Sequence, residues 1–370
     1  MKFTCEKHIL QNACAIASRA AASKSPIPAL EGLLIQCGST LTVTGYDLKK
    51  GIYTSIEAEI ENPGSIVVGA RLFGEMMRRL PDGKVSVEVD ANDNVNVKCG
   101  KSEFNFSGIN PDDYPEMPVV DGLNNISLPQ KILKSMINQT IFAVSDNDIR
   151  PIYTGTLFDV EENMLTLVSV DGYRLAKRCE KTEGATMENC SFVVPGSALS
   201  DIERICSDSE DEIKISVGAK HISFSMGNTV VVSRRLEGEF LNYKKSIPEN
   251  FKYMVEVERG EFMSAIDRVA LIINDKNSSP VRISFNDGNI DCLCVTPIGK
   301  AEDVCVCEGN GEGLEIGFND RYLMDALKAA GKDKLSICFN TASSPCIIRA
   351  ADGSENFTYM ILPVRLRAGN

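Results

Sequence analysis

Residues 165–178, LTLVSVDGYRLAKR, hold the pattern that decides the fold of this chain. Apolar and polar residues alternate up to Asp171-Gly172, and the alternation resumes beyond this break with basic residues. The pattern predicts a strand, a tight turn and a second strand, because Asp-Gly supplies the positive φ that such turns need. A similar stretch, LTVTGYDLKKG, occupies residues 41–51, and a weaker one, IDCLCVTPIGKAED, residues 290–303. One supersecondary unit that recurs three times indicates internal repetition.

Two predicted helices recur with this unit. In the second helix, expected over residues 70–80, 197–206 and 320–330, Leu199 follows Phe73 by 126 residues and Leu323 follows Leu199 by 124. We expect Asn319 to cap the last of these helices. The first helix carries an apolar stripe at helical spacing in each round. Its members are Ile9, Leu10, Ala13, Ile16 and Ala17, then Ile132, Leu133, Met136 and Thr140, and finally Phe262, Met263, Ile266, Val269 and Ala270.

The near-constant spacing predicts three tandem similar domains of the α+β class, at residues 1–120, 121–248 and 249–370. Proline-containing stretches at residues 110–118 and 237–248 are predicted linkers, because proline fits neither a helix interior nor a central strand. The spacing Ser127-x-x-Gln130 predicts a capping box at the first helix of the middle domain. We expect two helices and about eight strands in each domain, with the helices covering one face of antiparallel sheet.

Composition limits the class of protein. The chain has 370 residues, 43% of them hydrophobic, and a formal net charge of −12. It contains no apolar run of the roughly 18 residues that a membrane helix needs, and its N-terminus, MKFTCEKHIL, lacks the apolar core of a signal peptide. Thirteen cysteines along this length do not suggest a secreted disulfide scaffold. We therefore expect a folded protein of the cytoplasm with reduced thiols. Its acidic balance argues against a general nucleic-acid coat but leaves room for a basic face.

Groups for catalysis are scarce. The chain has only two histidines, His8 and His221, which argues against a histidine-based catalytic triad or a multi-histidine metal site. The glycines at residues 309–313 lack the strand and helix context of a phosphate-binding loop. The C-x-C pairs at Cys292 and Cys305 lie in alternating stretches, where both thiols of a pair simply face one side of a sheet. Asp171 is a candidate acid or base, but a turn-forming aspartate before glycine explains it without any chemistry. We predict no enzyme activity, no cofactor and no metal.

The motifs together resemble a known family. VDGYRLAKR, INPDDYPEMP, EGEFLNYKKSIP and the terminal YMILPVRL are similar to segments of the bacterial DNA polymerase III beta subunit, the processivity sliding clamp, and the likeness spans the whole chain. The resemblance implies a head-to-tail homodimeric ring of six similar domains. Helices would line a hole for duplex DNA, and antiparallel sheets would lie outside. It also implies a processivity factor that tethers the replicative DNA polymerase catalytic subunit, the clamp loader and other proteins with clamp-binding motifs.

The resemblance places DNA contacts on the inner helices. Lys24 and Asn147 match positions that contact DNA in the family. The other candidates are basic residues of the predicted helices, and for each of them a solvated helix face is an equally good explanation. They are Arg71, Arg78, Arg79, Lys131, Lys134 and Arg204, with Arg19, Arg268, Arg321 and Lys328 as further members. A ring that retains DNA by topology needs only weak, sequence-independent phosphate contacts.

The family also has a peptide-binding cleft between its second and third domains. Aliphatic walls with a few polar anchors suit extended peptides, although core packing at a domain junction would also explain the apolar members. Tyr173 stands where the family often has histidine, and Leu241-Asn242-Tyr243 where it often has Pro-Asp-Tyr. Carried over, the lining is Tyr153, Val170, Gly172, Tyr173, Arg174, Leu175, Leu241, Lys245, Ser246, Leu362, Pro363, Val364 and Arg365.

A closed ring requires a contact between first and third domains of two copies. We expect residues 71–80 and 103–106 to meet residues 271–273 and 302–307, with Phe106, Leu271, Ile272 and Ile273 as apolar contacts. The alternative function is a repetitive binding scaffold without DNA, such as a cell-surface array. Such a scaffold would ordinarily carry a secretion signal and fewer free cysteines.

Overall fold

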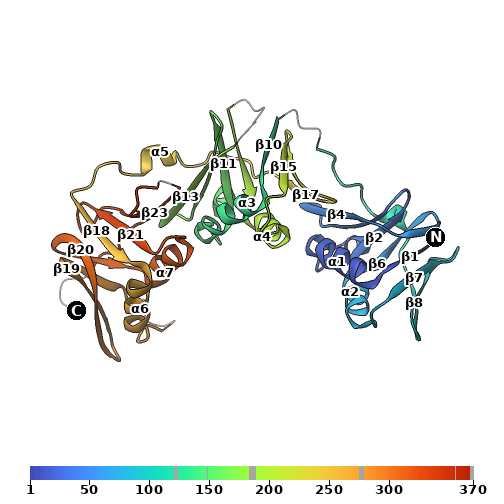
Figure 1. Cartoon of the computed structure of the whole chain (residues 1–370), viewed down its shortest axis with the longest axis horizontal. Helices are drawn as coiled ribbons and strands as arrows, with labels where there is room; N and C mark the ends of the chain where they lie inside the picture. The colour runs from blue at the N-terminus through green and yellow to red at the C-terminus, as the bar shows by residue number, and fades with distance from the viewer. Residues whose placement is uncertain (121–123, 148, 183–188, 275–278, 355, 367–370) are drawn as a thin grey trace. The chain divides into compact units, whose positions relative to one another are not determined.

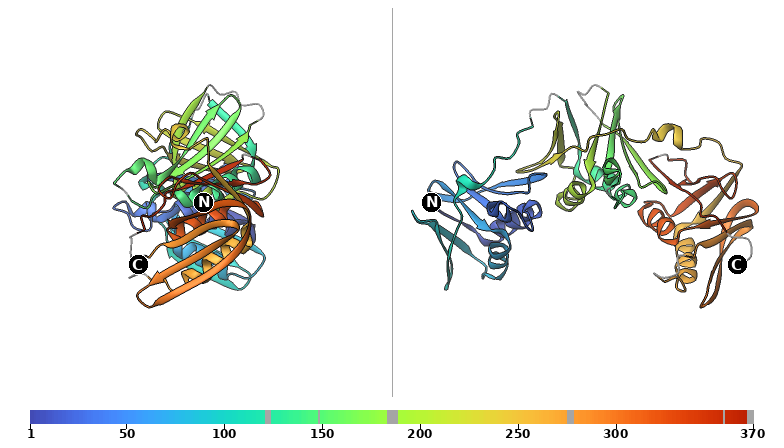
Figure 2. Two further views of the ribbon diagram at one scale, coloured as in Figure 1. Left: turned by 90° about the vertical axis from the view of Figure 1, so that its left-hand side faces the viewer. Right: turned by 180° about the vertical axis from the view of Figure 1, so that it is seen from behind.

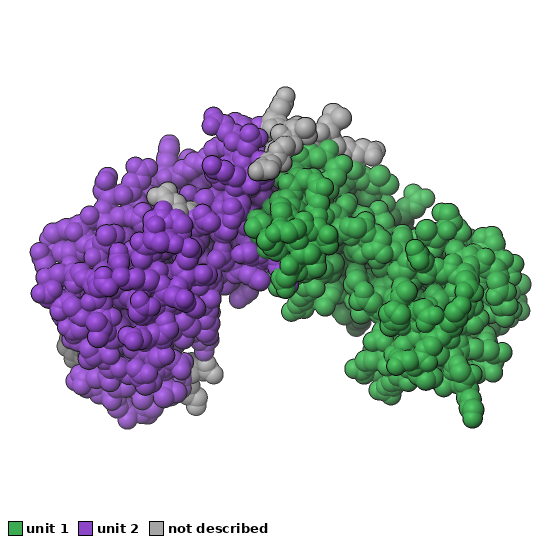
Figure 3. Space-filling model, in the orientation of Figure 1, with its two compact units in different colours: residues 1–133, 183–187, 201–235 green, residues 134–182, 188–200, 236–370 purple. Residues whose placement is uncertain are grey.

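The computed structural model describes residues 1–120, 124–147, 149–182, 189–274, 279–354 and 356–366. The chain divides into two compact units (Figure 3). Among the described residues, the first comprises residues 1–133 and 201–235, and the second residues 134–182, 189–200 and 236–366. The division runs through the middle repeat, whose strands belong to two different sheets.

The first unit contains two antiparallel sheets, one of order β5-β1-β7-β8-β9 and one of order β10-β15-β16-β17-β4-β3-β2-β6 (Figure 1). Helices α1 (Lys7–Ala17) and α2 (Ala70–Arg79) bury their apolar stripes against the sheets, with Leu10, Phe73 and Met77 fully enclosed. The strands are β1 (Lys2–Glu6), β2 (Gly32–Cys37), β3 (Leu41–Tyr46), β4 (Lys50–Ile56), β5 (Glu59–Asn62), β6 (Gly64–Gly69), β7 (Lys84–Val89), β8 (Asn94–Cys99), β9 (Ser102–Ser107), β10 (Asn124–Pro129), β15 (Glu212–Val217), β16 (His221–Met226) and β17 (Thr229–Arg234).

The second unit is built on one sheet of order β14-β11-β12-β13-β23-β22-β21-β18-β20-β19, which joins strands of the middle and last repeats (Figures 1 and 2). Helices α6 (Arg259–Ala270) and α7 (Asp320–Ala329) bury Phe262, Ile266 and Leu323 in the core of the last repeat. The remaining elements are α5 (Tyr243–Ser246), β11 (Gly155–Glu161), β12 (Met164–Val170), β13 (Arg174–Lys181), β14 (Cys190–Pro195), β18 (Tyr253–Glu258), β19 (Val281–Thr296), β20 (Gly299–Phe318), β21 (Lys334–Phe339), β22 (Cys346–Ala350) and β23 (Phe357–Ile361).

The helices of the middle repeat, α3 (Gln130–Asn138) and α4 (Gly196–Ile205), occupy the predicted places. Among the described residues, the repeats contain the strands β1 to β9, β10 to β17 and β18 to β23. The last repeat has fewer than the expected eight strands because β19 and β20 run on for 16 and 20 residues, with register shifts near Asp287. The predicted architecture of three tandem repeats with mixed helix and antiparallel sheet is confirmed.

Two predicted caps had different outcomes. Asn319 caps α7, because its side-chain oxygen accepts a hydrogen bond from the Tyr322 amide at 3.1 Å. The capping box at Ser127 was wrong. Ser127 lies inside β10 opposite Lys214, and the strand continues to Pro129 before α3 begins at Gln130. Pairing with β15 therefore outcompetes the local cap.

Candidate functional site

The Asp171-Gly172 turn is shaped by its own side chain. One carboxylate oxygen of Asp171 accepts hydrogen bonds from the amides of Tyr173 at 2.8 Å and Arg174 at 3.0 Å. Gly172 has a φ of +95°, which a side chain would disfavour. These bonds close the β12–β13 hairpin and show why an Asp-Gly pair suits this turn, so the turn explanation of Asp171 is sufficient.

Arg174 is held in place on three sides. Its Nε donates to the second oxygen of Asp171 at 3.0 Å, and a terminal nitrogen donates to Asp325 of α7 at 2.6 Å. Its guanidinium carbon lies 4.4 Å from the ring centre of Tyr322 and 5.4 Å from that of Phe142. Such charge-assisted bonds and ring contacts fix one side-chain orientation. Asp325, Tyr322 and Phe142 were missed by the sequence analysis, because nothing in their local sequence shows which turn they face.

An apolar cluster lies beside this turn. Val170 and Leu175 are opposite each other on β12 and β13, and Leu175 is also opposite Met360 of β23. All three are buried, and Tyr153 and Leu241 pack against the same cluster. The structure thus brings together Tyr153, Val170, Leu175 and Leu241 in one cluster. Because Leu175 is fully buried, it forms the floor of the site and not its rim.

The rim consists of exposed groups at the turn and after β23. Tyr173 is 63% exposed, and its ring stacks on Tyr322 with 6.1 Å between centroids. The amide of Leu362 donates to the Tyr173 carbonyl at 2.9 Å, so the chain after β23 follows the turn. Pro363 is partly buried, and Arg365 is exposed. This rim has aromatic, aliphatic and basic groups within a few residues of the buried floor.

Other predicted cleft residues are placed by different contacts. Val364 pairs its backbone with Gly317 at 2.8 Å and lines a cavity of about 180 Å³ together with Ile273 and Asn319. Lys245 and Ser246 belong to the short helix α5, where the Asn242 side chain caps the Lys245 amide. The remaining predicted members therefore lie on elements around the apolar cluster and are not all in contact with it.

The predicted DNA-contacting residues fall into two groups. Arg78 and Arg79 form ion pairs with Glu75 at 2.6 and 3.1 Å, and Lys131 pairs with Glu210. Lys24, Arg71 and Arg204 are exposed, and within the described ranges they form no ion pair.

The Asn147 side chain caps its own loop by accepting from the Ile149 amide at 2.9 Å, and Lys134 lies on α3. Of the further candidates, Arg19 pairs with Asp201 at 3.8 Å and Arg268 with Asp303. Arg321 and Lys328 lie on α7.

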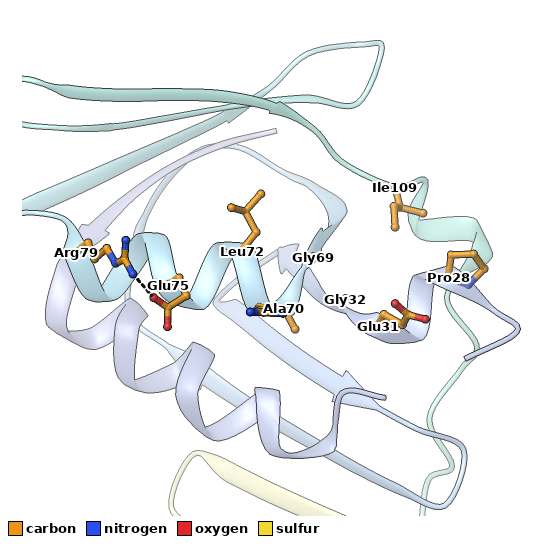
Figure 4. Close-up of a pocket in the computed structure, with 10 residues that line it drawn as sticks. Pro28, Glu31, Gly32, Gly69, Ala70, Leu72, Glu75, Arg79 and Ile109 are labelled. Carbon is orange, nitrogen blue, oxygen red and sulfur yellow. Dashed lines mark ion pairs between the residues drawn. The ribbon is translucent and has the colours of Figure 1, made fainter. Parts of the chain in front are cut away.

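A larger cavity, of about 800 Å³, lies in the first repeat between α2 and residues 28–32 (Figure 4). Leu72, Ile109 and Pro28 border it, and Glu75 and Arg79 form their ion pair at its edge. Arg71, one of the exposed candidates, also lines this cavity. It is distinct from the predicted cleft, because all of its lining residues belong to the first repeat.

The predicted contacts between copies are divided between the units. The ring of Phe106 packs on Phe73 with 6.4 Å between centroids, whereas the neighbouring Phe104 is 41% exposed. In the last repeat Leu271 is 79% exposed, and Ile272 and Ile273 are partly buried against the core. An exposed large apolar side chain therefore lies within each of the predicted regions 103–106 and 271–273.

The cysteine pairs of the last repeat are core residues. Cys292, Cys294, Cys305 and Cys307 are buried in its hydrophobic cluster. Burial raises the pKa of both Cys292 and Cys305 to about 12, which keeps these thiols protonated. In the part of the chain that the structure describes, no group of three or more metal-ligating side chains occurs, and no helix is long and apolar enough to cross a membrane.

Comparison with known proteins assigns the family. Models of the N-terminal, central and C-terminal domains of the DNA polymerase III beta subunit match residues 1–118, 127–242 and 244–365. The chain belongs to the DNA polymerase III beta subunit family. It is 32% identical to the beta sliding clamp of Staphylococcus aureus over 376 aligned residues, covering 99% of each chain. The family resemblance inferred from the motifs is therefore confirmed.

Solved structures agree with this assignment. A DNA polymerase sliding clamp from Bacillus subtilis superposes with a TM-score of 0.95 at 32% identity, over 99% of this chain and 100% of that one. A DNA polymerase III beta subunit from Thermotoga maritima superposes with a TM-score of 0.92 at 26% identity, with the same coverage. The protein is thus a sliding clamp, a processivity factor of DNA replication.

Proposed function

We propose that two copies of the chain form a closed head-to-tail homodimer that encircles duplex DNA and slides along it without sequence preference. Each chain contributes three domains, proposed at residues 1–120, 121–248 and 249–370. Family membership and the likeness to the Bacillus subtilis sliding clamp support this assembly. A ring holds DNA by topology, so an acidic chain of net charge −12 needs only a few weak phosphate contacts.

Lys24, Arg71 and Arg204 are the proposed first contacts to phosphate, because they are exposed and have no competing carboxylate among the described residues. Arg78, Arg79 and Lys131 must first give up their glutamate partners. Exposed ion pairs contribute little stability, so this exchange costs little for each pair. Lys134 and Asn147 complete the proposed set.

The surface beside the Asp171 turn is the proposed site for peptide segments of partner proteins. These partners are the replicative polymerase catalytic subunit, the clamp loader and other proteins with clamp-binding motifs. One observation carries this proposal: exposed Tyr173 and the fixed guanidinium of Arg174 stand directly beside a buried apolar cluster containing Leu175. Apolar pockets with a few oriented polar groups are suited to short peptides. No catalytic step is proposed, and the family role in replication supports a cytoplasmic location.

The retention of DNA tests the ring directly. The protein would be loaded onto nicked circular plasmid by a clamp loader with ATP, and the plasmid would then be cut once at moderate salt. We expect protein to stay on circles and to leave the linear product, because a topological link survives salt while phosphate contacts weaken steeply. A linear plasmid with both ends blocked by bound protein is the matched control, on which retention should return. Equal retention on open linear DNA would indicate ordinary groove binding instead.

A further inference from the structure

The two junctions between repeats within the chain carry the same ion pair. Lys50 follows the Asp47 turn and reaches Asp201 on α4, as Arg174 follows the Asp171 turn and reaches Asp325 on α7. Both pairs join residues 151 positions apart. The Asp47 carboxylate also accepts from two turn amides, at 2.8 and 2.7 Å, as Asp171 does. We call each contact the turn-to-helix ion pair.

The pairs occupy equivalent places in the repeat. Each base is the first residue of the strand after the turn, in β4 and in β13. Each acid is the sixth residue of the second helix of the next repeat, in α4 and in α7. The strand registers agree as well. Lys50 is opposite Ser233, the fifth residue of β17, and Arg174 is opposite Ile361, the fifth residue of β23.

The last repeat has the equivalent hairpin, with Thr296 in place of the aspartate, but no described strand pairs beside its turn. Thr296 and Gly299 close the β19–β20 hairpin, so Gly299 is the first residue of β20. Over Gly299 to Val306, β20 pairs with β19 alone among the described residues. Val304 and Val306 on this stretch are 57% and 70% exposed. A hollow of about 410 Å³ between α6 and this edge is lined by the same two valines.

The first repeat has the matching surface. β9 is the third strand after α2, as β17 and β23 are after α4 and α7, and it lies at the edge of its sheet. The sixth residue of α2 is Glu75, which is again an acid. In the single chain Glu75 binds Arg78 and Arg79 of its own helix instead. An exposed edge strand with apolar side chains is a template for pairing with another chain.

We propose that the contact between two copies is a third copy of this junction in which the turn-to-helix ion pair is missing. This inference rests on the proposed dimer and specifies how it is built. Gly299 of one copy stands opposite Phe106, the fifth residue of β9, in the other copy, and Lys300 stands opposite Asn105. Glu75 receives no base from the other copy, because Gly299 occupies the position that Lys50 and Arg174 occupy in the other two junctions. Ile272 lies two residues after the end of α6, as Arg19 lies two residues after the end of α1. Because Arg19 contacts Asp201, we infer that Ile272 borders the equivalent junction.

The missing pair gives the three junctions different strengths. All three have a backbone ladder and apolar contacts, but only the two within the chain add a partly buried charge pair. The junction between copies is therefore the one that separates while both chains stay folded. Restoring a base at position 299 should tighten the dimer, because Glu75 already stands where the acid belongs in the other two junctions.

The first experiment compares the dimer dissociation constants of Gly299→Arg and Gly299→Ala by sedimentation at low salt. Alanine is the matched control, since Gly299 has a φ of +156° and any side chain there carries the same backbone strain. We expect arginine to bind about fivefold more tightly than alanine, as for a single charge pair near a surface. Glu75→Gln should abolish this gain. Equal constants for arginine and alanine would overturn the missing-pair proposal.

A second experiment tests the register by oxidative cross-linking of two cysteine variants on exposed polar positions. Lys300→Cys mixed with Asn105→Cys should give a covalent dimer rapidly, whereas Lys300→Cys mixed with Glu103→Cys, shifted by two residues, should not. Native cysteines interfere little, since Cys179 and Cys190 alone of the thirteen are not buried. A covalent dimer formed by Lys300→Cys and Glu103→Cys would overturn only the proposed register, in which Lys300 stands opposite Asn105. A wild-type monomer at micromolar concentration would instead overturn the proposed ring.

Discussion

The junctions at Lys50 and at Arg174 share a backbone but present different chemistry. In the second junction the exposed turn residue is Tyr173, and the residue hydrogen-bonded to it is Leu362. In the first junction the same two places are taken by Lys49 and Arg234, whose backbones form the equivalent bond at 2.9 Å. One rim is aromatic and aliphatic, and the other is basic. The comparison teaches that the repeat supplies the scaffold, while two or three side chains decide which partner it suits.

The space beside the turn also differs. Position 51 of β4 is glycine where β13 has Leu175, and both residues lie directly across the hairpin from the last residue of the preceding strand. A Cβ at Gly51 would lie 2.1 Å from the Met117 sulfur. The linker after the first repeat therefore fills, with Met117, the space that Leu175 fills in the second junction.

Changing the floor of the second junction should have the largest effect. Leu175→Asp would put an unpaired charge among Val170, Met360 and Tyr153, which costs several kcal/mol. We expect a labelled hexapeptide with a glutamine anchor and a Leu-Phe end to lose binding altogether in a fluorescence titration. Lys49→Asp in the first junction is the matched control and should bind the peptide like the unchanged protein. Undiminished binding by Leu175→Asp in folded dimer would place the peptide site elsewhere.

Filling the first junction should have a moderate effect. Gly51→Leu forces Met117 out of its place, so the free energy of unfolding should fall by about 2 kcal/mol, as in other overpacked cores. Urea denaturation of Gly51→Leu with Met117→Ala should recover part of this loss. Gly74→Ala in α2, where a Cβ meets nothing within 4 Å, is the control and should stabilise by about 0.5–1 kcal/mol. If Gly51→Leu is as stable as the unchanged protein, the linker does not fill this space in solution.

Removing either acid should affect folding no more than filling the first junction does, and it should separate the two roles. The Asp201 side chain is 10% exposed and pairs with both Lys50 and Arg19, whereas that of Asp325 is 39% exposed. Asp201→Ala should therefore cost about 2 kcal/mol in urea denaturation and Asp325→Ala less than about 1, because solvent screens the second pair.

Asp325→Ala should weaken binding of the hexapeptide, because it releases the guanidinium of Arg174. Asp201→Ala should leave the peptide affinity unchanged. Equal peptide affinities for both variants would contradict a positioning role for Asp325. Sedimentation should show that both variants remain dimers, because neither pair lies at the proposed contact between copies.

Local sequence determined the repeated parts of this protein. Asp171-Gly172 specifies its turn because a short carboxylate and a positive φ are both needed within two residues, and Asn319 caps α7 for an equally local reason. The apolar stripes around Leu10 and Phe262 predict the helices because periodicity is itself local. The family motifs then carried the sliding-clamp assignment, which no single element would have indicated.

Tertiary structure decided what depends on residues far apart in the chain. The Ser127 cap fails because β15, more than eighty residues later, extends β10 through that position. The division of the middle repeat between two sheets follows from the pairing of β17 with β4 and of β13 with β23. The pairing of β13 with β23 also places Asp325 beside Arg174, although the two residues are 151 positions apart in the chain. Each of these contacts is set by strand register and packing, which a local pattern does not contain.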